Sequence, residues 1–252
     1  MDKRAIGVFD SGVGGLSCVP ALKNALPNEQ IIFYGDSARA PYGLRSESEI
    51  KQFALEDAKL LIDKGCKALS IACNTISCVA LDELCSAFPD VPVVGIVEPA
   101  AEKLAELYRD ENIALIATDA TVKNGAYERA LKKYGHCGRL FARACGNFVS
   151  PIEQGKTGPE FDTVIKESIG PLFEESGAKV LALGCTHFPF IAENLKRLYP
   201  DIALFNPADA LAQKTKEILK ARDMLSDEKA AEDIYLCSSQ SDTFARFVSR
   251  IK

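Results

Sequence analysis

The sequence predicts an α/β protein made of two similar doubly wound parallel-sheet domains. Short apolar runs rich in β-branched residues, such as "AIGVF" (5–9), alternate with amphipathic stretches, a pattern typical of β-α units around parallel sheets. One phrase occurs twice: "GCKALSIACNT" (65–75) returns as "GAKVLALGCTH" (177–187), and its cysteines, Cys73 and Cys185, are 185 − 73 = 112 residues apart. A chain of 252 residues is long enough for two such domains.

The expected elements follow one another along the whole chain. Strands are expected at the short apolar runs 5–9, 31–35, 68–72, 91–96, 113–117, 180–184 and 202–206. Helices are expected over the longer amphipathic stretches 49–64, 76–87, 122–133, 160–175 and 208–222. The tail, 233–251, has the pattern of a strand, a loop and a helix, and we expect it to return to the first domain.

The domain boundaries follow from the repeat. A second pair of related stretches, "PDVPVVGIVEPA" (89–100) and "PDIALFNPADA" (200–210), lies about one half-chain apart. We therefore expect a first domain of residues 1–98 plus 207–252 and a second of residues 99–206. We also expect an approximate two-fold axis to relate the two domains, with the active site in the cleft between them.

Composition excludes several classes of partner and site. The formal net charge of −5 and the lack of a basic cluster argue against nucleic acid and anionic membranes as partners. No apolar run is long enough to span a membrane, and "MDKRAIGVFD" lacks the apolar region of a signal peptide, so we expect a cytoplasmic protein. Nine cysteines, an odd number, argue against a disulfide framework. Two histidines and no C-x-x-C pair argue against a metal site.

The two repeated cysteines are the first candidates for chemistry. Each directly follows an expected strand, and ligands of open parallel sheets bind beyond the carboxyl ends of the strands. Backbone amides and the helix dipole at such a turn stabilise a thiolate. Polar residues follow both cysteines: Asn74 and Thr75 after Cys73, Thr186 and His187 after Cys185. Taken alone, each cysteine fits a buried structural residue better, and the polar neighbours are what favour a chemical role.

A third strand-end loop, "VFDSGVGG" (8–15), is rich in glycine. It lacks the G-K-[ST] ending of a P-loop, and Ser17 stands where a dinucleotide fingerprint needs its last glycine. Amides at a helix start suit a carboxylate, and Asp10 and Ser11 could bind an ammonium group or relay a proton. The alternative is a tight turn with Asp10 as the helix N-cap.

A fourth loop, "YGDSARAPYG" (34–43), offers a hydroxyl at Tyr42 and a free amide at Gly43. The same residues also suit an ordinary surface turn. The loop therefore becomes a candidate for substrate binding only together with the other three.

Two acid/base groups on opposite faces of one carbon are what stereochemical inversion requires, because one removes a proton and the other delivers one. Many amino-acid racemases solve this problem with pyridoxal phosphate on a lysine. Here Lys67 and Lys179 precede the expected strands, which places them at the opposite ends from the cysteines. The sequence therefore favours a thiol pair that uses no cofactor.

The motifs together closely resemble the glutamate racemases of the cofactor-independent aspartate/glutamate racemase superfamily. In chain order they are "DSGVGG" (10–15), "YGDSARAPYG" (34–43), "ACNT" (72–75), "TDATVKNGAY" (118–127) and "GCTHFP" (184–189). The resemblance implies two α/β domains with glutamate bound between them. It also implies cytoplasmic supply of D-glutamate for peptidoglycan synthesis, and thus for cell-wall biogenesis and cell shape, and it is compatible with a homodimer.

The resemblance also implies roles for particular residues. Cys73 would act on the D enantiomer with help from Asp10, and Cys185 on the L enantiomer with help from His187 and Glu153. The positions that resemble substrate-holding ones are Asp10, Ser11, Tyr42, Gly43, Asn74, Thr75, Thr186 and His187. Glu153 lies in a loop, 144–155, that departs from the more apolar family pattern, so a solvated loop carboxylate is the alternative for it. For His187 the alternative is a core histidine.

Three other functions remain compatible with the sequence. A racemase with another substrate, such as aspartate, would share the fold. A two-domain protein that binds a small anion would share the cleft and the loops but would have no use for opposed thiols. A redox switch would join Cys73 and Cys185 in a disulfide, whereas catalysis needs both reduced.

Overall fold

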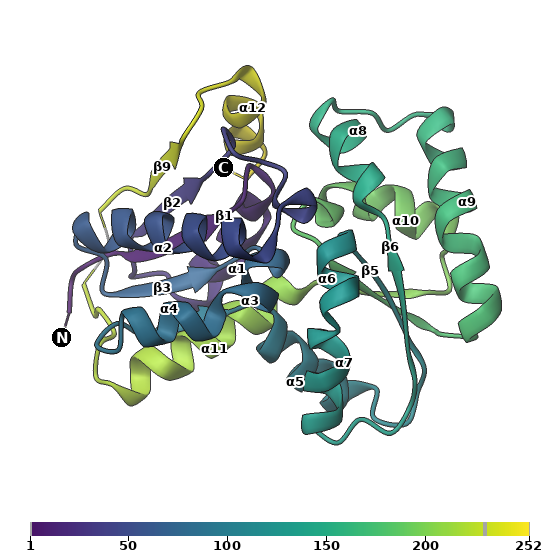
Figure 1. The fold of residues 1–252 in the computed structure, drawn as a ribbon, viewed down its shortest axis with the longest axis horizontal. Helices are drawn as coiled ribbons and strands as arrows, with labels where there is room; N and C mark the ends of the chain where they lie inside the picture. Colours follow the sequence, from purple (N-terminus) through teal and green to yellow (C-terminus); the bar gives the residue numbers. More distant parts are fainter. Residues whose placement is uncertain (1, 229–230, 252) are drawn as a thin grey trace. The chain divides into compact units, whose positions relative to one another are not determined.

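The computed structural model describes residues 2–228 and 231–251. The chain forms two compact units, Met1–Ile96 with Ala208–Lys252, and Val97–Pro207. Each unit contains one sheet in which all strand pairs are parallel, as Figure 1 shows. The predicted fold class, α/β with two parallel-sheet domains, is confirmed.

The first unit has a five-stranded sheet in the order β4-β3-β1-β2-β9. Its strands are β1 (Ile6–Asp10), β2 (Ile31–Gly35), β3 (Ala68–Ile71), β4 (Val93–Gly95) and β9 (Ile234–Cys237). The expected return of the tail is confirmed, because β9 pairs with β2 in a register that sets Ile234 beside Ile32.

Helices cover both faces of this sheet. They are α1 (Val19–Ala25), α2 (Glu47–Asp63), α3 (Asn74–Val79), α4 (Leu81–Ala87), α11 (Pro207–Ala221) and α12 (Asp242–Ile251), with 3-10 turns η1 (Gly14–Cys18) and η2 (Tyr42–Leu44). The expected single helix over 76–87 is wrong, because the chain breaks at Ala80 (φ −120°) between α3 and α4. Helix α2 starts with a capping box, in which Ser46 and Glu49 bond each other's backbone amides.

Strand residues of the first sheet alternate between two cores. Phe9 and Leu69 belong to the buried cluster that includes Leu61 of α2. On the opposite face, the Phe33 ring stacks against Phe244 of α12, with centroids 6.4 Å apart. Because both faces are covered, the strands consist of continuous apolar runs rather than alternating ones.

The second unit has a four-stranded sheet in the order β6-β5-β7-β8. Its strands are β5 (Ile113–Ala117), β6 (Leu140–Ala144), β7 (Val180–Gly184) and β8 (Ala203–Phe205). Its helices are α5 (Val97–Leu107), α6 (Asp119–Asn124), α7 (Ala126–Lys133), α8 (Val149–Glu153), α9 (Pro159–Ser176) and α10 (Ala192–Leu198), with 3-10 turns η3 (Gly146–Phe148) and η4 (Phe188–Ile191). The expected helix over 122–133 is interrupted at Gly125, whose φ of +70° lies in the left-handed region.

Each sheet contains one switch point, at which the order of strand addition changes from one side of the sheet to the other. In the first sheet the chain leaves β1 toward β2 on one side and leaves β3 toward β4 on the other, so β1 and β3 flank a switch point. In the second sheet β5 and β7 flank the equivalent point. Ligands of open α/β sheets bind beyond the carboxyl ends of such strand pairs.

Within the described part of the chain, no helix is both long and apolar enough to cross a membrane.

Candidate active site

Asp10 is the last residue of β1 and lies at the switch point of the first sheet. Its side chain is fully buried, and Oδ2 accepts a hydrogen bond of 3.0 Å from the Gly12 amide. The glycine loop wraps closely around this carboxylate, since a Cβ on Gly15 would lie 2.4 Å from Asp10 Cβ. Asp10 is not a helix N-cap: residue 13 precedes the first helical turn, and that turn has no side-chain cap.

Cys73 lies across the same switch point, two residues after the end of β3 and immediately before α3. The residue is buried, with 4% of its surface exposed, and its Sγ donates to Ser11 Oγ at 3.5 Å. Burial, together with the charge of Asp10, raises the pKa of the Cys73 thiol. The expectation of a stabilised thiolate is therefore wrong for this cysteine, because burial and a neighbouring carboxylate outweigh the hydrogen bonds that the sulfur receives.

The next two residues of the motif are also at this edge. Asn74 and Thr75 form the first turn of α3 and are buried. The structure thus brings Asp10, Ser11, Cys73, Asn74 and Thr75 together at the carboxyl ends of two adjacent strands.

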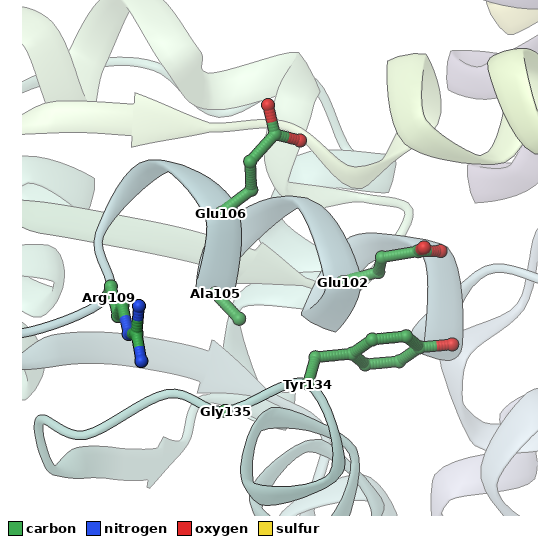
Figure 2. Close-up of a pocket in the computed structure, with 6 residues that line it drawn as sticks. All are labelled: Glu102, Ala105, Glu106, Arg109, Tyr134 and Gly135. Atoms are coloured by element: carbon green, nitrogen blue, oxygen red, sulfur yellow. The ribbon is translucent and has the colours of Figure 1, made fainter.

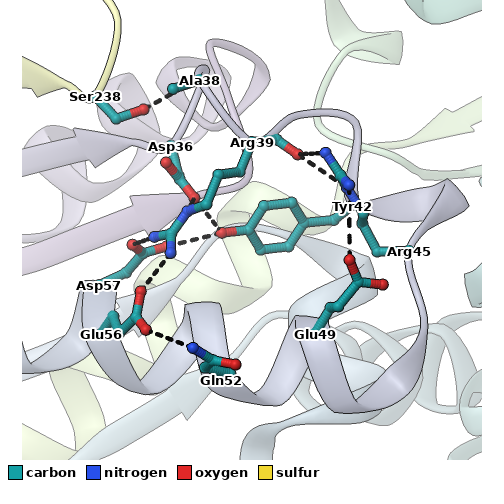
Figure 3. A network of polar contacts seen from close by, with 10 residues as sticks. All are labelled: Asp36, Ala38, Arg39, Tyr42, Arg45, Glu49, Gln52, Glu56, Asp57 and Ser238. Atoms are coloured by element: carbon teal, nitrogen blue, oxygen red, sulfur yellow. Dashed lines mark hydrogen bonds and ion pairs between the residues drawn. The ribbon is translucent and has the colours of Figure 1, made fainter.

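Tyr42 behaves differently from the prediction. Its hydroxyl is buried, donates to Asp36 Oδ2 and lies 3.2 Å from Asp57 Oδ2, as Figure 3 shows. This hydroxyl is therefore part of an internal network, which argues against its predicted role as a substrate-binding hydroxyl. The main chain of Tyr42 and Gly43, in the 3-10 turn η2, is what this loop can offer to a ligand.

The second unit holds a line of three groups beginning at Cys185, which directly follows β7. Cys185 Sγ is 3.9 Å from His187 Nδ1, and His187 Nε2 is 2.8 Å from Glu153 Oε1. Burial opposes protonation of the His187 ring, but the hydrogen bonds to Cys185 and Glu153 outweigh it and raise the pKa of His187 to about 10. A charged imidazole beside a cysteine sulfur stabilises negative charge on that sulfur.

Aromatic side chains hold these groups in place. Phe148, just before α8, contacts Phe188, the residue after His187, in an edge-on arrangement with centroids 5.7 Å apart. Phe148 also packs edge-on against Phe161 of α9 at the same distance. Glu153, at the end of α8, is 37% exposed and is paired with His187, which argues against the alternative of a solvated loop carboxylate.

Two hydroxyl groups near the second switch point, those of Thr118 and Thr121, were not among the site residues expected from the sequence. Thr118 directly follows β5, caps α6 and donates its hydroxyl to Thr121 Oγ1 at 3.0 Å. Since β5 and β7 are neighbours, Thr118 and Thr186 follow adjacent strands. The signal was present: "TDAT" after the run "IALIA" repeats the arrangement of a polar group after an apolar strand.

Cys145 lies at the same edge, after β6. It is fully buried, and burial raises the pKa of its thiol to about 12. This setting fits a structural cysteine.

A separate hollow of about 520 Å³ lies on the second unit (Figure 2) and is lined by Glu102, Ala105, Glu106, Arg109, Tyr134 and Gly135. No candidate residue lines it.

Among the described residues, no group of three or more His, Cys, Asp or Glu side chains could hold a metal ion. Lys67, just before β3, is buried and bonds Glu29 Oε2 at 2.7 Å and the carbonyls of Asp2 and Met224. All three ammonium protons are thereby engaged at the amino end of the sheet.

Comparison with known proteins gives consistent matches. The Asp/Glu/Hydantoin racemase family matches residues 6–215. A glutamate racemase of Bacillus cereus is 37% identical over 250 residues, covering 98% of this chain and 92% of that protein.

Solved structures agree over the whole chain. The glutamate racemase of Francisella tularensis in complex with D-glutamate superposes with a TM-score of 0.91 at 35% identity, covering 100% of this chain and 94% of that one. The Escherichia coli glutamate racemase in complex with L-glutamate and the activator UDP-MurNAc-ala gives 0.82 at 27% identity, covering 98% and 95%.

Proposed function

The chain belongs to the Asp/Glu/Hydantoin racemase family, a family of isomerases, and on this premise we propose that it interconverts L- and D-glutamate with two cysteines and no cofactor. The observation that carries the proposal is the repetition of one arrangement. Each sheet has a cysteine at its switch point, and each cysteine has a polar or ionisable partner within 4 Å of its sulfur. A protein that only binds an anion has no need of this repetition.

In the proposed reaction, the Cys185 thiolate removes the α proton of L-glutamate. The C–H bond breaks, the proton passes to sulfur, and the electron pair remains on the α carbon next to the carboxylate. The Cys73 thiol then delivers its own proton to the opposite face of that carbon, which gives D-glutamate. The reverse reaction exchanges the roles of the two sulfurs.

The surroundings of the two sulfurs support this starting state. The raised pKa of Cys73 keeps a proton on that sulfur, ready for delivery. The raised pKa of His187 keeps a positive charge 3.9 Å from the Cys185 sulfur, which suits that sulfur as the proposed base. Glu153 assists by stabilising the charged His187, and Asp10 assists Cys73.

The remaining candidates would hold the substrate. Hydroxyl and amide side chains suit the carboxylates and the ammonium group of glutamate, and we assign this role to Asp10, Ser11, Asn74, Thr75, Thr186 and His187, together with the main chain of Tyr42 and Gly43. Thr118 joins them because it follows β5, the neighbour of β7, and Thr121 joins them because it accepts the hydrogen bond of Thr118. We further propose that the D-glutamate formed in the cytoplasm supplies peptidoglycan synthesis, and that the enzyme acts as a homodimer.

The experiment that tests this function is racemisation in heavy water. Starting from L-glutamate, the early D product should carry deuterium at the α carbon while the remaining L pool does not, because each enantiomer loses its proton to one sulfur and gains one from the other. Mass spectrometry of the separated enantiomers at low conversion measures both pools. Substantial early label in unreacted substrate would refute two opposed bases, and turnover of L-aspartate in place of glutamate would refute the substrate.

A further inference from the structure

A buried polar cluster lies under the loop 36–45, between β2 and α2. Asp57, on α2, and Asp36, at the start of the loop, are both 1% exposed. Arg39 reaches both carboxylates from the loop, donating from Nε to Asp36 Oδ2 and from Nη2 to Asp57 Oδ1, the latter at 2.8 Å. Its third contact is Glu56 of α2. Figure 3 shows the carboxylates of Asp36 and Asp57 converging on the Tyr42 hydroxyl.

The hydrogen bonds of this cluster favour an additional proton. The Tyr42 hydroxyl has one proton, which it donates to Asp36, yet Asp57 Oδ2 also lies 3.2 Å from the same oxygen. One hydroxyl proton shared between two carboxylate oxygens gives two weak hydrogen bonds, whereas a proton on Asp57 allows both bonds to form fully. Two buried carboxylates beside a single guanidinium also disfavour full ionisation of both.

The cluster is linked to the proposed catalytic edge through the backbone. The Asp36 amide donates to the Asp10 carbonyl at 3.0 Å, so the start of the loop is tied to the end of β1. Near its middle, the Ala38 amide donates to Ser238 Oγ at 2.8 Å. These two bonds fix the first half of the loop. The second half, up to Tyr42, is held by side chains of α2, through the contacts of Asp57 with Arg39 and Tyr42.

We infer that Asp57 and Arg39 are positioning residues that fix the main chain of Tyr42 and Gly43 for substrate binding, and that Asp57 does so in its protonated form. This inference rests on the proposed function, because it concerns where that substrate is held. Neither Asp57 nor Arg39 needs to touch glutamate. Their effect reaches the ligand through the ring of Tyr42, which also packs against Phe53 at 5.5 Å.

The charges around Asp57 agree with a retained proton. Asp36 and Arg39 face it from the loop, Tyr42 from η2 and Tyr34 from β2, with Glu56 beside it on α2. Burial, followed by the charge of Asp36, raises the pKa of Asp57 to about 7. Above that pH the carboxylate would form next to Asp36, and its hydrogen bond to Tyr42 would be lost.

The test compares Asp57→Ala, which removes the contacts, with Asp57→Asn, whose amide can accept from Arg39 and donate to Tyr42 as the protonated acid does. Asp63→Ala is the matched control, because Asp63 is an exposed carboxylate on the same helix. KM and kcat for both glutamate enantiomers are measured from pH 6 to pH 9, with the thermal midpoint of each variant.

We expect Asp57→Ala to raise KM by about 10- to 100-fold with a much smaller change in kcat, because the loop binds ground state and transition state alike. Wild-type KM should rise above about pH 7, whereas KM of Asp57→Asn should stay low. If Asp57→Ala lowers only the thermal midpoint, or if Asp57→Asn follows the wild-type pH dependence, the inference is wrong while the proposed function stands. A wild type that does not racemise glutamate would overturn both.

Discussion

Glu153→Gln tests the three-group line of the second unit most directly. The substitution keeps the size of the side chain and its capacity to bond His187 but removes the negative charge 2.8 Å from the ring nitrogen. Two unit charges about 4 Å apart interact by about 4 kcal/mol at the effective dielectric of a protein surface and by about 1 kcal/mol in water. Because Glu153 is 37% exposed, we take about 1–3 kcal/mol, which corresponds to about one to two units of pKa.

The sign of the change follows from which form the charge stabilises. Glu153 favours the imidazolium, so its loss should lower the pKa of His187 from its raised value of about 10. The alkaline limb of the kcat/KM profile should move to lower pH by the same one to two units. The chain has only two histidines, so NMR can follow His187 directly, with His136 as an internal reference. Glu167→Gln, an exposed glutamate on α9, is the control.

Isotope effects should show that Glu153→Gln slows the proton transfer at Cys185 and not the proton transfer at Cys73. Because the two enantiomers are equally stable, kcat/KM must fall by the same factor in both directions. If Cys185 acts on the L enantiomer, however, Glu153→Gln makes the proton transfer at Cys185 slower relative to the transfer at Cys73. The deuterium isotope effect on kcat/KM should then rise for α-deuterated L-glutamate and fall for the D form. An unchanged His187 titration with unchanged isotope effects would refute the reasoning.

Two further predictions concern the cysteines and the buried ion pair. Cys73→Ala and Cys185→Ala should each abolish racemisation with unchanged circular dichroism, whereas Cys145→Ala should keep turnover; activity in either of the first two would contradict a two-thiol mechanism. Lys67→Met should lower the free energy of unfolding by about 3–5 kcal/mol, because it leaves Glu29 as an uncompensated buried charge. Urea denaturation measures the loss, and adding Glu29→Leu should recover most of it; no recovery would show that the uncompensated charge is not the cause.

Every described strand except β6 was expected from the sequence, and the fully buried strands are marked most clearly. Residues 31–35 and 113–117 were expected as strands and form β2 and β5, because full burial demands continuous apolar side chains. β6 was missed although the other edge strands, β4, β8 and β9, were expected. Its sequence, LFARA, is only partly buried and includes Arg143, so no apolar run marks it.

The features of the candidate site also differ in how far the sequence could predict them. The repeat pointed to Cys73 and Cys185, because a strand-end position depends on local sequence. The contact between Glu153 and His187, and the destination of the Tyr42 hydroxyl, depend on which helices pack against the strand-end loops. Such contacts join residues 34 and 15 positions apart, and no local pattern encodes them.

The repetition and the differences between the two halves have separate consequences for the proposed reaction. Two sheets with the same switch point give two sulfurs in equivalent local positions, which suits a substrate whose two enantiomers differ only in the face that bears the proton. Identical surroundings, however, would give both sulfurs the same proton affinity, and inversion needs one base and one acid at the same time. Cys73 lies beside a carboxylate and a hydroxyl, whereas Cys185 lies beside a histidine that a second carboxylate keeps charged. In the proposed reaction, the common fold would supply the positions of the two sulfurs, and their differing neighbours would distinguish the sulfur that accepts a proton from the sulfur that delivers one.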